Sequence, residues 1–366
     1  MNSLVEMHVS TLEGYMEALR ISQNSFLKNT SIKINNINNS FAKPTELIKQ
    51  INYGLSSVFS SSKGNFASSQ MYGYSANTIA NPFGLNCKIF LNAEYYSNKE
   101  EMNNLICSSA GIAETLNKKI KHSNDDIKKI VVLNEWIKKH FSYKNTNKTE
   151  DHAAVSLLVN RHGVCQAIAA LSTLILSYMG IKTMYVVGQG RSQDGWGGHA
   201  WNIVFVNDRW IHIDFTHSMN LLFLSSTLTK ASSVQFRKKH LWDEQEYASK
   251  RMDYKWNANN RLNCSPVLLK ANKKYCFFNG VIVKFSKPLL IIKNSEILVD
   301  MKAVIRMLGG GVEMSPNNKN MIICLNNMRR RVYVGDKRRG DYYDIDILKK
   351  ISRRIVSDGN IIGALI

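Results

Sequence analysis

Apolar positions in the middle of the chain recur at helical spacing. The run Ala167–Met179 is almost wholly apolar, it follows Cys165, and Gly180 stands where a helix would end. Two earlier stretches, Lys99–Lys121 and Ile127–His140, have amphipathic spacing, and Ser123-Asn-Asp-Asp before the second supplies helix-capping residues. The pattern therefore predicts three helices, the last of which is buried and begins at a cysteine.

Alternating apolar and polar positions around these helices predict strands at 87–95, 182–187, 199–206 and 209–215. Asn207-Asp208, between the last two strands, is a two-residue turn of the kind that hairpins prefer. The five glycines of Gly188–Gly198 predict a flexible loop beside His199, and such a loop is a natural rim for a substrate site.

The ends of the chain follow other patterns. Residues 1–30 have helical spacing, residues 31–82 are rich in Asn and Ser apart from a helix expected at 45–58, and 60–74 is expected to be a loop. Short strands and the helix 301–308 follow residue 270, and 355–362 partly repeats 291–298. The chain is thus expected to have an α+β fold with three parts. These are an N-terminal helical and loop extension at 1–84, a central domain at 85–262, and a small C-terminal α+β module at 270–366 whose second repeat is incomplete.

The hairpin turn fixes which residues lie opposite one another. Paired positions sum to 415, so Asp214 faces Trp201 and lies on the sheet face of His199, one diagonal step away, with roughly 7–8 Å between backbones. Cys165 opens a helix, where unpaired N–H groups and the helix dipole favour thiolate over thiol. The three residues are therefore predicted to act as a nucleophile (Cys165), a general base (His199) and an orienting carboxylate (Asp214).

A metal site formed by Cys165, His199, His212 and Asp214 is the alternative chemistry, because His212 shares the sheet face. The sequence has no paired Cys-x-x-Cys or His-x-x-x-His unit there, so we expect neither a metal nor a cofactor.

These motifs resemble the transglutaminase-like superfamily of papain-like cysteine enzymes. The resemblance rests on Gly163-Val-Cys165 at a helix start, His199-Ala-Trp201 on a strand, and Asp214 on the next strand, where Asp214-Phe-Thr216 replaces the common Asp-Pro-Thr. Phe-Ser-Tyr143 and Leu157-Leu158 match upstream features, so the resemblance covers roughly 85–256.

This resemblance implies a papain-like core, in which the cysteine-bearing helix packs on an antiparallel sheet, and a protein or peptide substrate. Cys165, His199 and Asp214 would transfer an acyl group through a thioester, as in a peptidase or a protein-crosslinking transglutaminase. The second oxyanion donor stays open, with Tyr143 as a candidate. The alternative is a non-catalytic binding or scaffold protein that uses a transglutaminase-like module.

The C-terminal part, about 275–366, resembles the module named after the N-terminal domain of copper amine oxidases, which is often attached to bacterial cell-surface enzymes. It implies no copper, because no histidine follows His240, and Asp300 replaces the usual proline before the helix.

The net charge of +20 is concentrated in this C-terminal part, where 19 Lys and Arg face 8 Asp and Glu in residues 263–366. Clusters such as Arg329-Arg-Arg331 could bind an anionic polymer (cell wall, nucleic acid or lipid headgroups) or could form a solvated basic face. A nucleic-acid binder built on this part would lack any RNP, helix-turn-helix or zinc pattern.

Apolar runs, cysteine spacing and the N-terminal sequence indicate the cellular compartment. No apolar run is long enough for a transmembrane segment, and the six cysteines have no regular spacing, which favours reduced thiols. The N-terminus lacks the basic and apolar regions of a signal peptide, so the chain as given is expected to be cytoplasmic. The resembled architecture is commonly exported, and a start site upstream of Met1 would make it a cell-surface or secreted protein.

Overall fold

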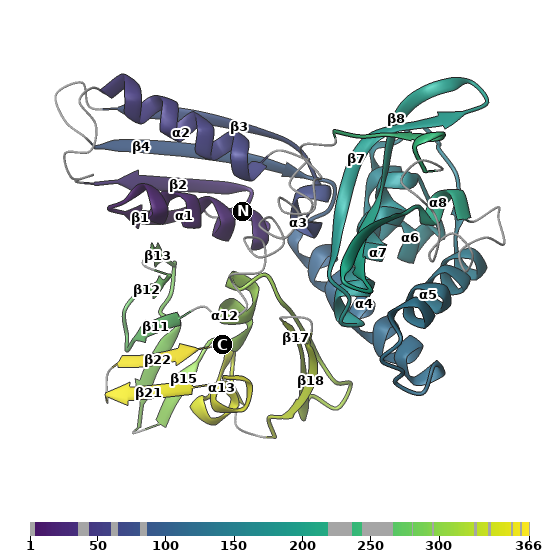
Figure 1. The fold of residues 1–366 in the computed structure, drawn as a ribbon. Coiled ribbons are helices and arrows are strands. Elements are labelled where there is room, and N and C mark those ends of the chain that lie inside the picture. Colours follow the sequence, from purple (N-terminus) through teal and green to yellow (C-terminus); the bar gives the residue numbers. More distant parts are fainter. Residues whose placement is uncertain are drawn as a thin grey trace.

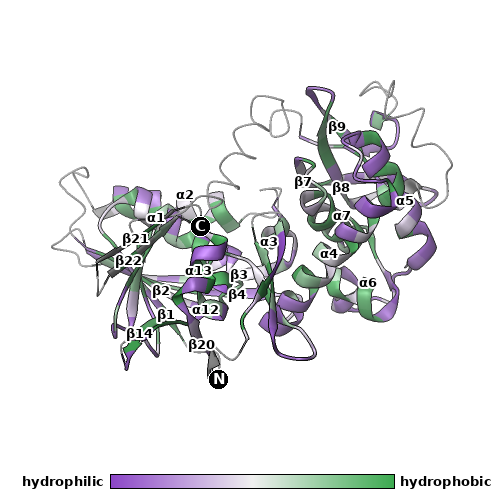
Figure 2. Ribbon diagram, turned by 90° about the horizontal axis from the view of Figure 1, so that it is seen from below, coloured by the Kyte–Doolittle hydropathy of each residue, from purple (hydrophilic) through white to green (hydrophobic). Residues whose placement is uncertain are grey.

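The chain forms two lobes, which Figure 1 shows side by side. The computed structural model describes residues 4–35, 44–59, 65–80, 86–218, 236–243, 266–279, 281–294, 296–325, 328–335, 338–352, 354–358 and 361–365. The terminal lobe combines the described residues of 4–95 and 266–365, and the central lobe contains 99–218 and 236–243. The ribbon coloured by hydropathy shows the same division, with hydrophobic segments in both lobes (Figure 2).

A nine-stranded sheet joins the two ends of the chain in the terminal lobe. Its order is β21-β22-β11-β12-β13-β1-β2-β4-β3. The strands are β1 (Val5–Val9), β2 (Asn29–Ile34), β3 (Met71–Ala80), β4 (Cys87–Tyr95), β11 (Pro266–Lys270), β12 (Tyr275–Phe278), β13 (Val281–Lys284), β21 (Arg354–Asp358) and β22 (Ile361–Leu365). Met7 of β1 lies opposite Val283 of β13, so segments more than 270 residues apart share one sheet.

The strand pairing in this sheet differs from the predicted domain boundary at 84/85 and from the predicted separate C-terminal module. β4 pairs with β2 and β3 instead of joining the central lobe, and β13 pairs with β1. The helix expected over 1–30 is also wrong at its start, because residues 5–9 form β1. Met7 and Val9 are fully or almost fully buried there, as alternate positions of a strand are.

Helices cover the N-terminal strands. Thr11 caps α1 (Leu12–Asn24), and α2 (Pro44–Phe59) confirms the helix expected at 45–58. The hydroxyl of Tyr15 donates to the carbonyl of Ile51, which fixes one helix on the other. Residues expected to be a loop at 60–74 contain α3 (Phe66–Ser69) and the start of β3, whereas 60–64 lie outside the described residues.

The other described residues of the C-terminal part form two small sheets and two helices. They are β14 (Leu290–Lys293), β15 (Glu296–Val299), β19 (Arg338–Arg339) and β20 (Tyr342–Asp344) in one sheet, β16 (Gly311–Met314), β17 (Asn320–Leu325) and β18 (Met328–Tyr333) in the other, with α12 (Met301–Met307) and α13 (Ile345–Ile351). The two predicted repeats both form hairpins, β14–β15 and β21–β22, but the second joins the nine-stranded sheet.

The central lobe places helices against a four-stranded antiparallel sheet of order β10-β7-β8-β9. Its elements are α4 (Lys99–Lys119), α5 (Asp126–His140), β5 (Ser142–Tyr143), a 3-10 helix (Thr149–His152), α6 (Ala154–Asn160), β6 (His162–Gly163), α7 (Cys165–Tyr178), β7 (Thr183–Ser192), β8 (Gly195–Val206), β9 (Arg209–Ile213), α8 (Phe215–Ser218) and β10 (His240–Leu241). Leu171 and Ile175 of α7 are fully buried in one core with Val204 of β8. The chain thus has the predicted α+β class, with the cysteine-bearing helix packed on the antiparallel sheet.

The two lobes meet through α4. Ile106, Cys107 and Ala110 of this helix form a buried cluster with Ile322 and Cys324 of β17. The Asn103 side chain accepts from the N–H of Val312 at 2.9 Å and donates to its carbonyl at 3.2 Å. The C-terminal part is therefore attached to the central lobe by buried contacts as well as to the N-terminal strands.

Two expectations concern the whole chain. The five cysteines that the structure describes are free thiols, as expected. Within the described ranges, no helix has both the length and the apolar character needed to cross a membrane.

Candidate active site

Cys165 is the first residue of α7, and it is half-buried beside Ala169, Tyr185 and Ala200. Val164 precedes it in extended conformation and supplies no side-chain cap. The first N–H groups of an α-helix have no partner within the helix, so those next to Cys165 remain available to an oxygen that carries negative charge.

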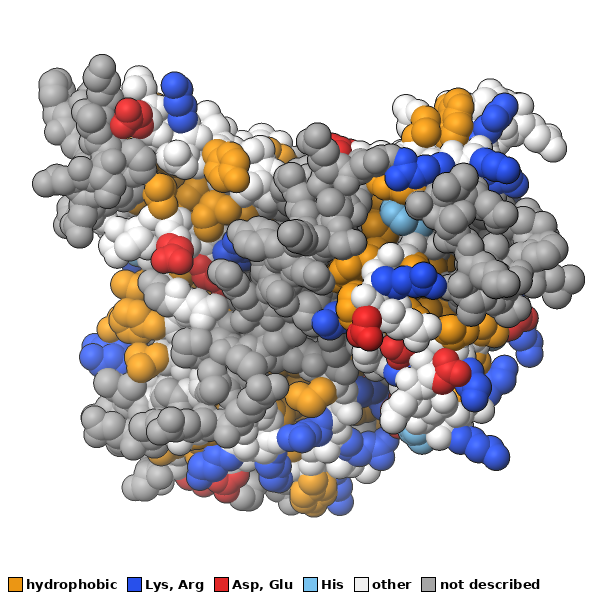
Figure 3. Space-filling model, viewed as in Figure 1, with side chains coloured by type: hydrophobic (Ala, Val, Ile, Leu, Met, Phe, Trp, Pro, Cys, Tyr) orange, Lys and Arg blue, Asp and Glu red, His pale blue; other side chains and the backbone are white. Residues whose placement is uncertain are grey.

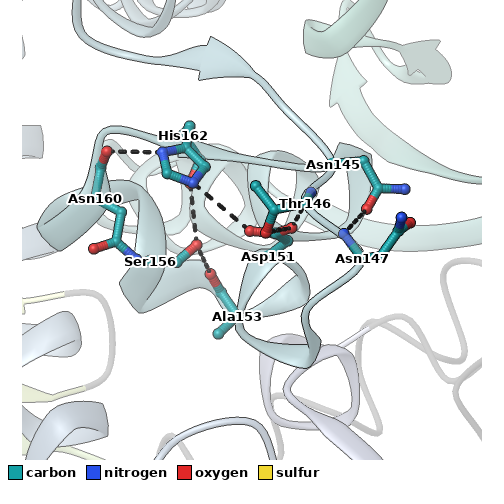
Figure 4. Close-up of polar contacts among 8 residues, drawn as sticks. All are labelled: Asn145, Thr146, Asn147, Asp151, Ala153, Ser156, Asn160 and His162. Carbon is teal, nitrogen blue, oxygen red and sulfur yellow. Dashed lines mark hydrogen bonds and ion pairs between the residues drawn. The ribbon is translucent and has the colours of Figure 1, made fainter.

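A buried carboxylate fixes the segment that leads into Cys165. Figure 4 shows Asp151 accepting hydrogen bonds from Thr146 and facing the ring of His162, whose Nε2 lies 3.7 Å away. The carbonyl of Asp151 accepts from the N–H of Val164 at 3.0 Å. The hydrogen bonds of Thr146 hold the pKa of Asp151 below its usual range, so the carboxylate stays ionised in this network.

Tyr143 lies next to the cysteine. β5 and β6 pair in parallel, with Tyr143 opposite Gly163, which precedes Cys165 by two positions. Burial raises the pKa of the Tyr143 phenol, and the negative charges of Cys165 and Asp214 raise it further. The phenol therefore stays protonated at neutral pH and is a hydrogen-bond donor within electrostatic reach of Cys165.

The structure brings His199 and Asp214 together, as the hairpin register predicts. Asn202 lies opposite Ile213, so paired positions sum to 415, and Asn207 and Asp208 have the positive φ values of 50° and 58° that such a turn requires. Asp214 follows the end of β9, and its Oδ2 lies 2.8 Å from Nε2 of His199.

Hydrogen bonds decide the charge of His199. Burial lowers the pKa of its ring, but hydrogen bonds with Asp214 and Cys165 outweigh burial and raise the pKa to about 10. The ring is therefore an imidazolium at neutral pH. Because Nε2 is used by Asp214, Nδ1 is the nitrogen left for the sulfur of Cys165.

His240 is a residue of the site that sequence reasoning missed. β10 pairs with β7 so that His240 lies opposite Gly190, and only 3% of its surface is exposed. Its Nε2 lies 2.8 Å from the same Oδ2 of Asp214 that contacts His199, and its Nδ1 lies 3.2 Å from the carbonyl of Phe236. The one signal in the sequence was the aromatic and basic segment around it, which carries no register information.

His212, which the sequence placed in an alternative metal site with Cys165, His199 and Asp214, has a different partner in the structure. Nδ1 of His212 accepts a hydrogen bond from the indole N–H of Trp201 at 2.8 Å. Burial lowers the pKa of His212 to about 3, helped by the charges of His240 and Arg237, so the ring is neutral.

The described side chains that lie close enough together to hold a metal ion are instead His199, Asp214 and His240. Hydrogen bonds already use these atoms, since both rings contact Oδ2 and the N–H of Thr216 donates to Oδ1 at 2.8 Å. The two rings are thus joined by hydrogen bonds through Asp214.

The loop expected at 188–198 is wrong, because β7 and β8 extend through it as a hairpin with Ser192 opposite Gly195. Close approach explains two of the five glycines, Gly188 and Gly190. A Cβ on Gly190 would lie 2.8–2.9 Å from three atoms of His199, and one on Gly188 would lie 2.3 Å from the carbonyl oxygen of Leu241.

A cleft of about 1280 Å³ opens in front of His199. The side chains and backbone that line it are Lys138, Phe141, Ser142, Tyr143, Gly190, Arg191, Ser192, Gln193, Gly197, Gly198, His199, Thr216, Lys238 and Lys239. The hairpin therefore forms one wall of the cleft, as expected of the glycine-rich segment, but as ordered strands. The basic and aromatic segment 221–256 follows α8 in the sequence, and 236–243 are its described residues.

Comparisons with known proteins point to one family. The family described as the transglutaminase-like superfamily matches residues 114–215. No curated protein sequence matches the chain.

Solved structures that resemble parts of the chain include a candidate cysteine protease from Cytophaga hutchinsonii (14% identity, TM-score 0.27, 40% of this chain and 65% of that one). Others are a TGase (11%, 0.28, 61% and 56%) and a candidate protease from Parabacteroides distasonis (10%, 0.24, 50% and 39%). The chain thus spans less than two thirds of the length of each.

The family match begins within α4, runs through Cys165 and His199, and ends one residue after Asp214. It stops before the C-terminal part of the chain. Residues 114–215 of this chain therefore form a transglutaminase-like domain.

Proposed function

We propose that the central lobe is a cysteine-dependent acyltransferase that acts on peptide amides through a thioester on Cys165. The observation that carries this proposal is the chain of contacts from Cys165 at an uncapped helix start to the His199 ring and from that ring to Asp214. The imidazolium state of His199 supports a thiolate partner, because the positive ring stabilises the negative sulfur.

In the first half-reaction, the thiolate of Cys165 attacks the amide carbonyl and forms a carbon–sulfur bond. The carbon–nitrogen bond then breaks as the leaving amine takes a proton from Nδ1 of His199, which becomes neutral. In the second half-reaction, the oxygen of water or the nitrogen of a neutral amine attacks the thioester and gives up a proton to Nδ1 of His199 as the new bond forms, and the carbon–sulfur bond then breaks to restore the thiolate. Asp214 holds the ring in the orientation that these proton transfers need.

The oxyanion of each tetrahedral intermediate needs donors beside Cys165. The N–H of Cys165 itself and the hydroxyl of Tyr143 are the two we assign, because the first is uncapped and the second lies opposite Gly163. A Tyr143→Phe variant should then lose turnover by about 10-fold to 1,000-fold and retain its fold.

Water as acceptor gives a peptidase, and an amine gives a crosslinking transglutaminase. Incubation with a panel of peptides and proteins, with and without a primary amine, followed by mass spectrometry, distinguishes cleavage from incorporation. Cys165→Ala is the control and should abolish both. Iodoacetamide at about pH 6 should label Cys165 well before the other thiols. Equal labelling of all thiols, with no turnover on any substrate, would favour a non-catalytic binding module.

A further inference from the structure

Cationic side chains surround the cleft. Lys138 comes from the end of α5, Arg191 from β7, and Lys238 and Lys239 from the segment before β10, whereas no Asp or Glu is among the described residues that line the cleft. The N–H of Arg191 donates to the carbonyl of Lys239 at 2.9 Å, which fixes two of these segments side by side. Figure 3 shows Lys and Arg side chains gathered around a histidine near the β7–β8 hairpin.

Little of this positive charge is neutralised within the part of the chain that the structure describes. Lys138 has an ion pair with Glu135, but the two charged groups are 3.9 Å apart and the glutamate is largely exposed. Arg191, Lys238 and Lys239 are exposed and form no ion pair with another described residue. A cleft lined by one sign of charge concentrates its field on whatever enters it.

We infer that the cleft binds acidic polypeptide segments, with Asp or Glu side chains within a few residues of the amide that Cys165 attacks. This inference rests on the proposed function, because the His199 ring that lines the cleft is hydrogen-bonded to Cys165, whose sulfur needs a carbonyl carbon as its target. Each exposed pair of opposite charges strengthens binding by about 1.5-fold to 5-fold, so two or three pairs give about 10-fold.

Binding is measured on the full chain carrying Cys165→Ala, by fluorescence anisotropy with labelled peptides that are identical except for Glu, Gln or Lys beside the target amide. We expect the Glu peptide to bind about 10-fold more tightly than the Gln peptide at about 50 mM salt, and the difference to shrink at about 500 mM. The Lys peptide should bind most weakly. Equal binding of the Glu and Gln peptides would overturn the inference.

Charge reversal tests the location. Lys238→Glu with Lys239→Glu should remove the preference for Glu, whereas Lys139→Glu, on the exposed side of α5 outside the cleft lining, should keep it. An equal loss in both variants would mean that net charge and not the cleft selects the peptide. Turnover of the same peptides by the unmodified chain is a separate measurement, so a bound but unprocessed Glu peptide would contradict the proposed function alone.

The hydrogen bonds of His240 carry a second inference. The carbonyl of Phe236 only accepts, and so does the ionised carboxylate of Asp214, so both ring nitrogens of His240 must donate. A ring that donates from both nitrogens is an imidazolium. Asp214 thus lies between two positively charged rings, and with a thiolate at Cys165 the four charges sum to zero.

We propose that His240 is a positioning residue, which holds Asp214 toward His199 with a second N–H and offsets its negative charge. Among the described residues, the other titratable or charged groups near this cluster are His212 on β9, Cys165 on α7, Tyr143 on β5 and Arg237 before β10. His212 is neutral and Tyr143 is protonated, so among the described residues His240 is the group, besides His199, that both donates to the carboxylate and opposes its charge.

Two variants of the full chain separate the donor from the charge. His240→Gln retains an N–H near the position of Nε2 but removes the charge, whereas His240→Leu removes both. At about pH 6, iodoacetamide should alkylate Cys165 of His240→Gln at a rate within a few-fold of the parent. In His240→Leu the rate of Cys165 alkylation should be at least about 10-fold lower.

The titration of His199, followed by nitrogen NMR of the ring, is the readout that a purely structural role would not change. Loss of the positive charge in His240→Gln should move the His199 midpoint upward, because the Asp214 charge is no longer offset. An unchanged midpoint in both variants, with thermal stability reduced, would show that His240 only packs the segment onto β7.

Discussion

Replacing Gly190 by alanine tests whether the His199 ring is held as tightly as the structure indicates. The added Cβ would lie 2.8 Å from Cγ and 2.9 Å from Cβ and Cδ2 of His199. Carbon atoms in contact are normally about 3.5–4.0 Å apart, so the ring or the strand must move by about 0.6–1.2 Å. A displacement of about 1 Å in a catalytic group can cost about 100-fold in rate, so we expect a loss of that order in kcat/KM.

The matched variant is Gly197→Ala, on the facing strand, where an added Cβ meets no atom within 4 Å. Both variants are measured for turnover of the best peptide, for the rate of Cys165 alkylation and for thermal unfolding. Gly190→Ala should lose far more activity than Gly197→Ala while unfolding at a similar temperature. Equal activities would refute the close contact between the hairpin and the ring, and the glycines would then need another explanation.

Three further predictions concern the same site and its support. Asp214→Asn should lower turnover by about 10-fold to 1,000-fold with little change in unfolding temperature, because a thiol depends less on its base than a hydroxyl does; activity within twofold of the parent would assign the orienting role elsewhere. The pKa of His199 is raised from 6.5 to about 10, so the stability that its charged ring contributes is complete below pH 6.5 and is lost as the pH rises through about 10. In a pH–rate profile, the acylation rate should fall over the same alkaline range. A chain truncated after Asn260 loses β13, which pairs with β1, and the partners of α4 in β17, so circular dichroism and gel filtration should show an unfolded or aggregated product; a soluble, active product would contradict this.

Local signals made the hairpin of the site predictable. The alternation of 199–206 and 209–213 and the Asn207-Asp208 turn specify one register, and that register alone brings His199 near Asp214. The apolar run after Cys165 likewise specifies where α7 begins. Both features depend on residues close together in the sequence, where periodicity and turn chemistry carry the information.

Non-local pairing explains the expectations that were wrong. β1 lies between β2, with which it pairs in parallel, and β13, more than 270 residues later, and nothing in residues 1–30 encodes the second partner. Gly188–Gly198 has the composition of a loop, but Gly188 and Gly190 occur where strand β7 passes close to the carbonyl of Leu241 and to His199. Glycine-rich composition alone predicts a flexible loop, but glycine also occurs where two ordered segments lie too close together for a side chain.

The contact of His240 with Asp214 depends both on local sequence signals and on non-local pairing, and it gives the short segment 236–243 a chemical role. The two ring donors to Oδ2 come from different strands, His199 from β8 and His240 from β10, and β10 is held by its pairing with β7. Because Gly188 leaves room for the carbonyl of Leu241, the close approach of β10 depends on the same strand whose Gly190 admits the His199 ring. The orientation of Asp214 is therefore set jointly by a hairpin that local sequence encodes and by a segment whose position only the folded chain determines.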